Sequence, residues 1–228
     1  MQLSIIIPVV NEATVLPGLL EHLAPLHACG VEIIVVDGGS EDGSQQIASY
    51  TGVQVIGAER GRARQMNAGA SAAHGDVLLF LHADTLLPLC AGQAIEAAIR
   101  RSGHAPEHAW GHFDVCIDGR SFMLWVVARL MNWRSRLSGI ATGDQAMFVS
   151  RFAFEAVGGF PDQPLMEDVE LSKRLLARSG PICLTDRVVT SGRRWEAYGV
   201  WRTIWLMWRL RWSYWRGVSP GELAKSYR

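Results

Sequence analysis

Runs of continuous apolar residues alternate with helical patterns through the first half of the chain, and this alternation limits the possible folds most strongly. The strand-like runs cover residues 3–7, 31–36, 53–56 and 77–81. Because these runs are continuously apolar, both faces of each strand must be covered, as in a parallel sheet with helices on each side. Helical patterns separate the runs, near residues 13–27, 44–50 and 61–74. The order strand, helix, strand, helix predicts an α/β fold.

The second half of the chain is less regular. Residues 109–117 and 146–149 have the composition of strands, and an apolar helix is expected to follow the first of them. Residues 167–178 predict a helix with acids in its first turn and basic residues in its last. Without repeats or linkers, the chain reads as one domain over residues 1–228. We divide it into a first half (1–100), a second half (101–195) and a C-terminal helical element (196–228).

Composition narrows the class of protein. Acidic and basic residues balance at 22 each, which argues against a nucleic-acid-binding protein, since such a protein needs a basic surface. The N-terminal apolar run has no basic leader, and no apolar stretch of about 18 residues occurs, so we expect neither a signal peptide nor a membrane-spanning helix. The cysteines lack zinc or CxxC spacing and read as reduced thiols of a cytoplasmic protein: Cys29, Cys90, Cys116 and Cys183.

Polar residues follow three of the predicted strands. Asn11 and Glu12 come after the first, Asp37 ends the second, and His82 and Asp84 come at the end of the fourth. In open parallel sheets ligands bind beyond the carboxyl ends of the strands. His82 and Asp84 are two residues apart in an apparent strand, so both side chains are expected to face the same side. Each group alone is also explained by a helix cap or a tight turn; their convergence favours a site.

The residue types at these strand ends favour a nucleotide. Neither GxGxxG nor GxxxxGK[ST] occurs, which argues against dinucleotide oxidoreductases and P-loop enzymes. Asp37 can accept hydrogen bonds from a base or a ribose, and Asp84 can bind a divalent cation that bridges phosphates. Arg60, Arg62 and Arg64 suit phosphate, or else form a solvated basic turn. Together these residues describe a nucleoside diphosphate held by a metal.

Two adjacent carboxylates supply a candidate base. Glu167 and Asp168 begin the predicted helix of residues 167–178. A carboxylate beside a bound sugar can take a proton from an incoming hydroxyl group. The alternative is the ordinary enrichment of acids at a helix N-terminus, and pattern alone favours this alternative.

Several segments together resemble glycosyltransferase family 2, the inverting enzymes of the GT-A fold that use nucleotide-activated sugars. The matching segments are IIIPVVNE, VVDGGSEDGS, GRARQMNAGA, GDVLLFLHAD, GDQAMFVSR, GGFPDQPLMEDVEL and SGRRWEAYG. Their order and spacing are more specific than any one of them. The chain is most similar to a small bacterial subgroup with a His-Ala-Asp-Thr variant of the Asp-x-Asp motif. The resemblance implies an α/β fold of GT-A type, with a Rossmann-like, mostly parallel sheet flanked by helices and followed by an aromatic-rich C-terminal helix.

The resemblance also implies roles on the donor side. The residues expected to bind the nucleoside diphosphate sugar are Pro8, Glu12, Asp37, Arg60, Arg64, His82 and Asp84. Asp84 matches the metal and diphosphate contact, and His82 stands where the family has its first Asp. Imidazole suits Mn²⁺ better than Mg²⁺, so His82 is either a second metal ligand or a ribose contact that leaves Asp84 as the sole protein ligand. We therefore expect a divalent cation, Mn²⁺ or Mg²⁺.

Catalytic and acceptor residues are carried over in the same way. Asp168 matches the catalytic base of the family, and Glu167 is the lesser candidate. The residues assigned to the acceptor side are Gly143, Asp144, Gln145, Arg193, Arg194 and Trp195. The last three only loosely resemble the Arg-Trp element of processive members, whose full motif is absent, so processivity is not implied.

Five tryptophans recur at spacings of four, three, four and three: Trp201, Trp205, Trp208, Trp212 and Trp215. On a helix they form one stripe, flanked by Arg202, Arg209 and Arg216. The stripe either packs into the domain, or against a second copy in a homodimer, or lies in a membrane interface, where Trp and Arg are favoured. The last option suits a lipid-linked acceptor and a cytoplasmic protein peripheral to the inner face of the cell membrane.

The sequence thus predicts a metal-dependent inverting glycosyltransferase with an unidentified hydroxyl acceptor. One alternative is a sugar-nucleotide pyrophosphorylase, which needs a glycine-rich basic loop after the first strand; residues 8–13 provide none. The other is a non-catalytic, membrane-associated binding protein with the same fold, which hydrolysis of a donor by the purified protein would exclude.

Overall fold

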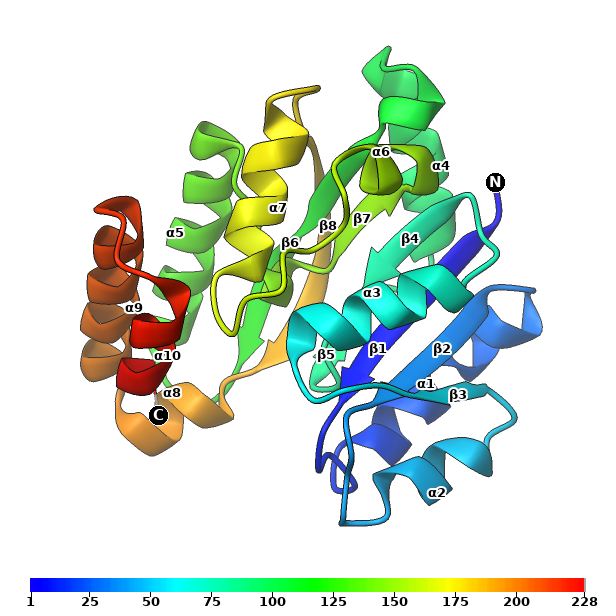
Figure 1. The fold of residues 1–228 in the computed structure, drawn as a ribbon, viewed down its shortest axis with the longest axis horizontal. Helices are drawn as coiled ribbons and strands as arrows, with labels where there is room; N and C mark the ends of the chain where they lie inside the picture. Colours follow the sequence, from blue (N-terminus) through cyan, green and yellow to red (C-terminus); the bar gives the residue numbers. More distant parts are fainter. Residues whose placement is uncertain (228) are drawn as a thin grey trace.

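The structure, a computed structural model, describes residues 1–227 and contains one eight-stranded sheet (Figure 1). The strands are β1 (Leu3–Val9), β2 (Glu32–Asp37), β3 (Gln54–Gly57), β4 (Val77–Phe80), β5 (Thr85–Leu86), β6 (Trp110–Asp118), β7 (Met147–Ser150) and β8 (Ile182–Ser191). The helices are α1 (Leu16–Ala28), α2 (Ser44–Ser49), α3 (Arg62–Ala72), α4 (Ala91–Ser102), α5 (Phe122–Ser138), α6 (Arg151–Ala156), α7 (Glu167–Leu176), α8 (Arg193–Tyr198), α9 (Val200–Trp215) and α10 (Pro220–Tyr227).

The sheet has the order β3-β2-β1-β4-β7-β6-β8-β5. Strands β1 to β4 pair in parallel, and β6 pairs in parallel with β8. Strand β7 runs antiparallel to both β4 and β6, and β5 runs antiparallel to β8. The prediction of a mostly parallel α/β sheet is therefore confirmed, with β7 and β5 as the reversed strands.

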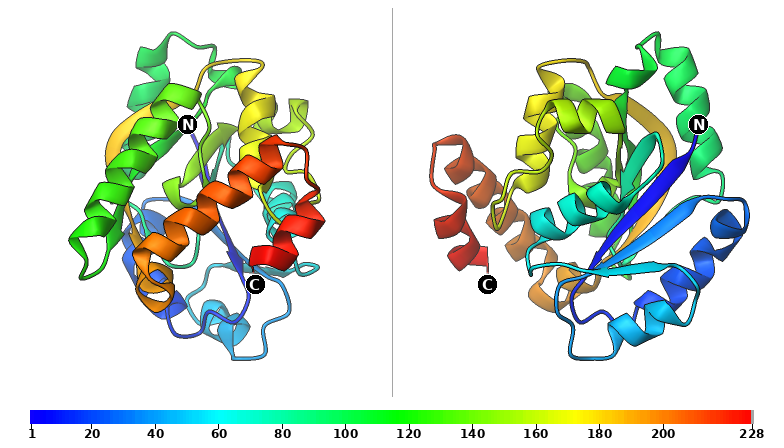
Figure 2. Two further views of the ribbon diagram at one scale, coloured as in Figure 1. Left: turned by 90° about the vertical axis from the view of Figure 1, so that its left-hand side faces the viewer. Right: turned by 45° about the vertical axis from the view of Figure 1, so that its right-hand side comes forward.

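Helices cover both faces of the sheet, as the continuous apolar runs predict. Along β1, Ile5 and Ile7 belong to one apolar cluster and Ile6 to the other, because successive side chains of a strand point to opposite faces. The first cluster packs against α1, α2, α4 and α5, and the second against α3, α6 and α7. The right panel of Figure 2 shows α1 and α3 on opposite sides of β1 and β2.

The last two helices lie at the edge of the molecule farthest from β3 (Figure 1). Helix α9 docks through Leu206, Leu210 and Tyr214 against Met166 and Leu223, the latter from α10. The Tyr214 hydroxyl also donates a hydrogen bond to Glu170 Oε2 at 3.1 Å. The tryptophans of α9 lie away from this docked face, and each is between 60% and 76% exposed. The alternative that packs the stripe into the domain is therefore wrong.

Candidate functional site

The loops after β1 and β2 meet at one edge of the sheet. Val9 is paired with Asp37 in the parallel register, so the two strands end side by side. The buried Gln65 of α3 ties these ends together, because its Nε2 donates to the backbone carbonyls of Val9 and Val36 at 2.9 and 2.8 Å. Pro8 lies in β1 opposite Val36. The strand ends predicted to bind the nucleoside therefore form one rigid platform.

The Asp37 side chain stabilises the turn that directly follows it. Its buried carboxylate accepts hydrogen bonds from the backbone N–H groups of Gly39 and Ser40, both at 3.0 Å to Oδ2. Gly39 has a φ of 87°, which favours glycine, so the tight-turn alternative describes this segment correctly. Oδ1 has a longer contact of 3.3 Å with the Ser40 N–H. The role of Asp37 in nucleoside binding stays a prediction.

Glu12 lies beside Asp84. Burial, and then the charge of Asp84, raise the pKa of Glu12 above its ordinary value. Arg193 Nη2 lies 3.9 Å from Glu12 Oε2 and 3.7 Å from Asp84 Oδ2, so one guanidinium bridges the two acids. The structure thus places Arg193 with the predicted donor residues. These contacts lend no support to its assignment to the acceptor side.

His82 and Asp84 do not share one side of a strand. Strand β4 ends at Phe80, and a hydrogen bond from the Thr85 N–H to the His82 carbonyl at 3.1 Å closes a turn between them. His82 Nδ1 lies 3.3 Å from Asp144 Oδ1, whereas Asp84 faces Arg193. The expectation that His82 and Asp84 face the same side is therefore wrong, because residues two apart share a face only within a strand.

The acids at this edge fit a cation better than His82 does. Within residues 1–227, no group of three or more His, Cys, Asp or Glu side chains could hold a metal ion. Mg²⁺ in nucleotide sites needs only one or two carboxylates besides the phosphates, which Asp84 and the neighbouring Glu12 can supply. A cation there would also relieve their repulsion, which contributes to the raised pKa of Glu12. His82 has Asp144 as its partner, and its role as a metal ligand or a ribose contact stays a prediction.

Asp168 is held by two backbone N–H groups. The N–H of Gly143 donates to Oδ2 at 2.8 Å, and that of Val169 donates to Oδ1 at 2.7 Å. Glu167 is 3% exposed, and its Oε1 lies 3.6 Å from Arg62 Nη1. Burial, and then the charge of Asp168, raise the pKa of Glu167. Asp168 is the oriented, half-buried carboxylate of the pair, which favours it over Glu167 as the base.

The turn Gly143–Gln145 connects Asp168 to His82. A Cβ at position 143 would collide with the His82 ring, so only glycine allows this approach. Partial burial raises the pKa of Asp144, but the hydrogen bond with His82 and the charges of His82, Arg62 and Arg194 outweigh it and hold the pKa below its ordinary value. Gln145 is fully buried and donates to Ser135 Oγ at 2.9 Å, so it supports the turn and its assignment as an acceptor contact is wrong.

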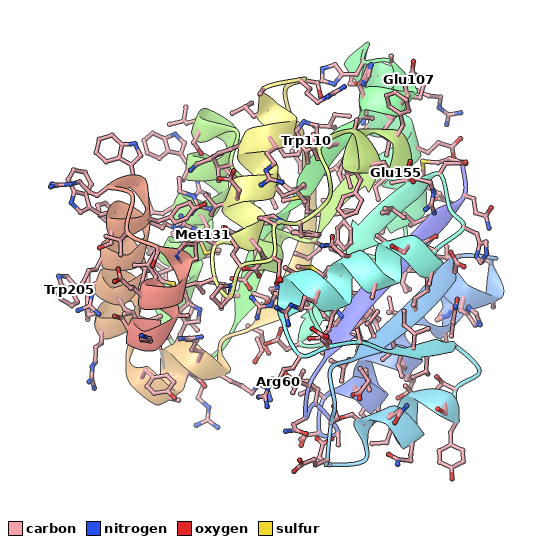
Figure 3. The ribbon with its side chains drawn as sticks, in the orientation of Figure 1. Arg60, Glu107, Trp110, Met131, Glu155 and Trp205 are labelled. Atoms are coloured by element: carbon pink, nitrogen blue, oxygen red, sulfur yellow. The ribbon has the colours of Figure 1, made fainter. Side chains whose placement is uncertain are left out.

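The three arginines before and in α3 have different roles. Arg64 donates to Asp162 Oδ1 at 2.8 Å and to Glu59 Oε2 at 2.7 Å, so its guanidinium is engaged by two exposed carboxylates. The assignment of Arg64 to phosphate is therefore not supported. Arg60 is exposed in the loop before α3 (Figure 3), and its role stays a prediction. Arg62 lies at a small cavity that His82, Gly143, Glu167 and Asp168 also line.

Arg194 and Trp195 also differ from each other. Trp195 is half-buried and packs against the apolar cluster that includes β1, so the structure lends no support to its assignment to the acceptor side. Arg194 lies near the Gly143–Gln145 turn, since its positive charge contributes to the lowered pKa of Asp144 in that turn. Of the three residues at the start of α8, Arg194 therefore keeps the acceptor-side assignment as a prediction.

The sequence analysis missed Arg134, on α5. Its Nε and Nη2 are buried and have no hydrogen-bond partner. Burial lowers the pKa of Arg134, and the charges of Asp168 and Asp144 oppose this shift. A buried guanidinium with free donors beside two carboxylates is costly unless something binds there. No sequence signal marks it, since an arginine on a predicted helix is normally a surface residue.

Comparisons with known proteins identify the family and the fold. A family model described as Glycosyl transferase family 2 matches residues 4–158. Curated proteins of Mycobacterium tuberculosis and Mycobacterium bovis, named PGL/p-HBAD biosynthesis glycosyltransferase, are 40% identical over 91 residues, which are 37% of this chain and 36% of theirs. The match therefore spans about a third of the length of these relatives.

Three solved structures have similar folds. S. aureus TarS 1–349 aligns with a TM-score of 0.66 and 19% identity, over 84% of this chain and 61% of TarS. The mannosyltransferase PcManGT from Pyrobaculum calidifontis, in complex with GDP-Man and Mn²⁺, gives 0.60 and 21%, over 82% and 56%. Glucosyl-3-phosphoglycerate synthase from M. tuberculosis, in complex with Mg²⁺ and UDP, gives 0.58 and 18%, over 83% and 70%. At these identities the likeness concerns the fold, and the predicted GT-A architecture is confirmed.

Proposed function

The chain belongs to glycosyl transferase family 2, and from that premise we propose that it moves a sugar from a nucleoside diphosphate sugar to a hydroxyl group with inversion. The observation that carries this proposal is the hydrogen bond between the Gly143 N–H and Asp168 Oδ2 at 2.8 Å. This bond holds the Asp168 carboxylate at the Gly143–Gln145 turn, and Asp144 of the same turn contacts His82. The base and the nucleotide-binding edge are thereby joined in one site.

Asp168 acts as the general base. It takes the proton of the acceptor hydroxyl while that oxygen attacks the anomeric carbon, and the bond from this carbon to the phosphate oxygen breaks. The nucleoside diphosphate leaves with the electron pair of that bond. One displacement inverts the configuration, so a second nucleophile is not needed. The two N–H groups that bind Asp168 keep an oxygen lone pair aimed at a fixed point.

The donor lies across the ends of β1, β2 and β4. Asp37 and Pro8 form the platform for the nucleoside, and Glu12, Asp84 and Arg193 face the diphosphate. When a divalent cation is bound, Asp84 with Glu12 would hold it, and it supplies positive charge for the departing diphosphate. The similar structures of PcManGT and of glucosyl-3-phosphoglycerate synthase contain Mn²⁺ with GDP-Man and Mg²⁺ with UDP, respectively, which supports this assignment.

Two variants test this arrangement, one through donor turnover and the other through metal-dependent donor affinity. Asp168→Asn should lower donor turnover by about two orders of magnitude or more, because the base is lost, and should leave the affinity for UDP or GDP nearly unchanged. Asp84→Ala should abolish the Mn²⁺-dependent part of that affinity, measured by calorimetry. Asp162→Asn, in an exposed carboxylate that pairs with Arg64, is the matched control. Near-normal turnover by Asp168→Asn would refute its role as the base.

A membrane surface is the proposed location of the acceptor. No helix within residues 1–227 is long and apolar enough to cross a bilayer. Helices α5 and α9 lie on the same side of the molecule, as the left panel of Figure 2 shows. Besides the tryptophans of α9, α5 exposes several large apolar side chains there: Phe122, Trp125, Leu130, Trp133 and Leu137. Neither helix contains an Asp or Glu. Aromatic and basic residues without acids suit the headgroup region of an anionic leaflet.

A further inference from the structure

A basic groove lies between α8, α9 and α10. It has a volume of about 330 Å³. Its lining residues are Arg194, Tyr198, Arg202, Thr203, Trp205, Leu206, Arg209 and Ser226. Three of these are arginines and none is acidic. The planar forks of guanidinium groups match phosphate oxygens, so a groove lined by several of them suits a phosphate group.

Apolar side chains also line the groove, among them Trp205 and Leu206. Trp205 is 64% exposed, and the Arg209 guanidinium lies 5.0 Å from its ring centre. Figure 3 shows Trp205 on α9 at the outer edge of the molecule. Leu206 continues from the groove into the apolar contact of α9 with Met166. The groove therefore has a charged wall that suits an anionic group and an apolar wall that suits the apolar part of the same ligand.

Two residues link the groove to the candidate catalytic centre. Arg194 is close enough to Asp144 for its charge to contribute to the lowered pKa of that acid. On the other side, α9 packs against Met166, the residue directly before Glu167 and Asp168. Arg194 and Met166 thus link the groove to the turn and the helix start that hold the proposed base.

We propose that this groove binds the phosphate group of an acceptor that carries an apolar body, and so presents the acceptor hydroxyl to Asp168. The inference rests on the proposed function, because it names the class of acceptor for the same site. The phosphate belongs either to a lipid headgroup or to a soluble phosphate ester. Both sources have the same chemistry at the arginines and differ in how much the apolar wall contributes.

Calorimetry with two probes tests the groove, in the presence of saturating UDP so that the donor site is filled. The probes are inorganic phosphate and dodecyl phosphate below its micelle concentration. Arg202→Gln with Arg209→Gln should weaken the binding of dodecyl phosphate by about tenfold or more, because two guanidinium contacts are lost. If inorganic phosphate binds far more weakly than dodecyl phosphate, the ligand is a lipid; a modest difference indicates a soluble ester; equal binding means that the apolar wall contributes nothing and overturns the apolar body of the proposal.

A matched pair outside the groove provides the control. Arg129→Gln with Arg216→Gln removes the same charge, and Arg129 also lies 5.0 Å from a tryptophan ring, that of Trp125. This pair should change the affinity by less than about twofold. Equal weakening by both pairs, no weakening by the groove pair, or no binding of either probe by the unmodified protein would overturn the inference. Circular dichroism checks the fold, and if the groove pair unfolds, Arg202→Lys with Arg209→Lys, which loses only the fork geometry, must weaken binding instead.

Donor hydrolysis by the unmodified protein separates this inference from the proposed function. If dodecyl phosphate binds in the arginine-dependent way but no donor is cleaved, the proposed function fails and the groove remains a phosphate site. If the donor is cleaved but neither probe binds, the proposed function stands and the groove is not the acceptor site.

Discussion

Backbone strain gathers around the residues that we assign to the site. Among residues 1–227, the non-glycine residues with positive φ are Asn11, Ala146 and Met166, at 57°, 45° and 64°. Each is a neighbour in sequence of a candidate site residue, respectively Glu12, the Gly143–Gln145 turn and Glu167. Such conformations cost about 1–3 kcal/mol each and persist where the surroundings enforce them. Their positions agree with a site whose geometry is maintained at the expense of stability.

Arg134 gives the sharpest prediction for a single residue. Arg134→Met should leave the free energy of unfolding unchanged or raise it by about 1 kcal/mol, because two buried unsatisfied donors are removed. Turnover should nevertheless fall by about tenfold, since the positive charge that interacts with Asp168 and Asp144 is lost. Thermal unfolding and donor turnover measure the two effects. A destabilised variant with normal turnover would assign Arg134 a structural role.

Glu167 should make stability depend on pH. Its folded pKa is raised, so the folded protein must carry a buried charge once the pH exceeds that value, and wild-type stability falls as pH rises through it from the ordinary 4.5. Glu167→Gln lacks this loss. The melting temperature of the variant minus that of the wild type should therefore increase between about pH 4 and about pH 7. Glu155→Gln, in an exposed residue of α6, is the control, and a constant or decreasing difference for Glu167→Gln would contradict the assignment.

At the level of the helix, α9 has one docked face and one exposed face. The docked face is held by Leu206, Leu210 and Tyr214, and the tryptophan stripe is exposed. Replacing Trp208, Trp212 and Trp215 with Ser should therefore release the protein from anionic liposomes without unfolding it. Trp205 is left in place because it lines the groove. Co-sedimentation with liposomes and circular dichroism measure the two outcomes.

The matched control replaces exposed apolar residues elsewhere, namely Tyr50, Leu89 and Phe152, which are 90%, 56% and 54% exposed. It should leave liposome binding unchanged. If the tryptophan variant instead dissociates a dimer, seen by light scattering, the stripe is a contact between copies. If the unmodified protein does not bind liposomes, the membrane location is wrong.

The sequence predicted those elements whose hydrophobic pattern is set by burial on both faces. Strands β1, β2 and β4 lie close to their expected positions for this reason, and helix α7 does so because acids mark its first turn and basic residues its last. Strand β8 was missed, since its apolar residues alternate with exposed ones and with Asp186 and Arg187. The turn at residues 82–85 was read as strand because the apolar run continues to Leu81, whose N–H still donates to the Ile6 carbonyl at 3.0 Å after β4 has ended.

For the site, the sequence could predict residues that end strands, because topology brings strand ends together. It could not predict which side chains turn toward each other, as the separation of His82 from Asp84 and the engagement of Arg64 by Asp162 show. Nor could it distinguish the buried Arg134 from surface arginines, since burial of one position on an amphipathic helix depends on tertiary packing.

Across the whole molecule, charge is segregated although it sums to zero. Residues 122–138 and 200–216 contain seven of the 22 basic residues and none of the 22 acidic ones. The remainder of the chain therefore carries a net excess of seven negative charges. One side of the molecule is basic and aromatic, and the candidate catalytic centre adjoins it through Met166. This distribution favours an acceptor with negative charge that approaches from the side of α5 and α9.

The stereochemistry of donor cleavage tests the central claim most directly. In the absence of an acceptor, water can take the place of the hydroxyl group at Asp168. Proton NMR during the first turnovers of UDP-glucose or GDP-mannose with Mn²⁺ reports the anomeric configuration of the released sugar before it equilibrates. We expect the α-linked donor to give the β-sugar, and we expect Asp168→Asn to give almost none. Release of the α-sugar, or equal release by Asp168→Asn, would contradict a single inverting displacement driven by Asp168.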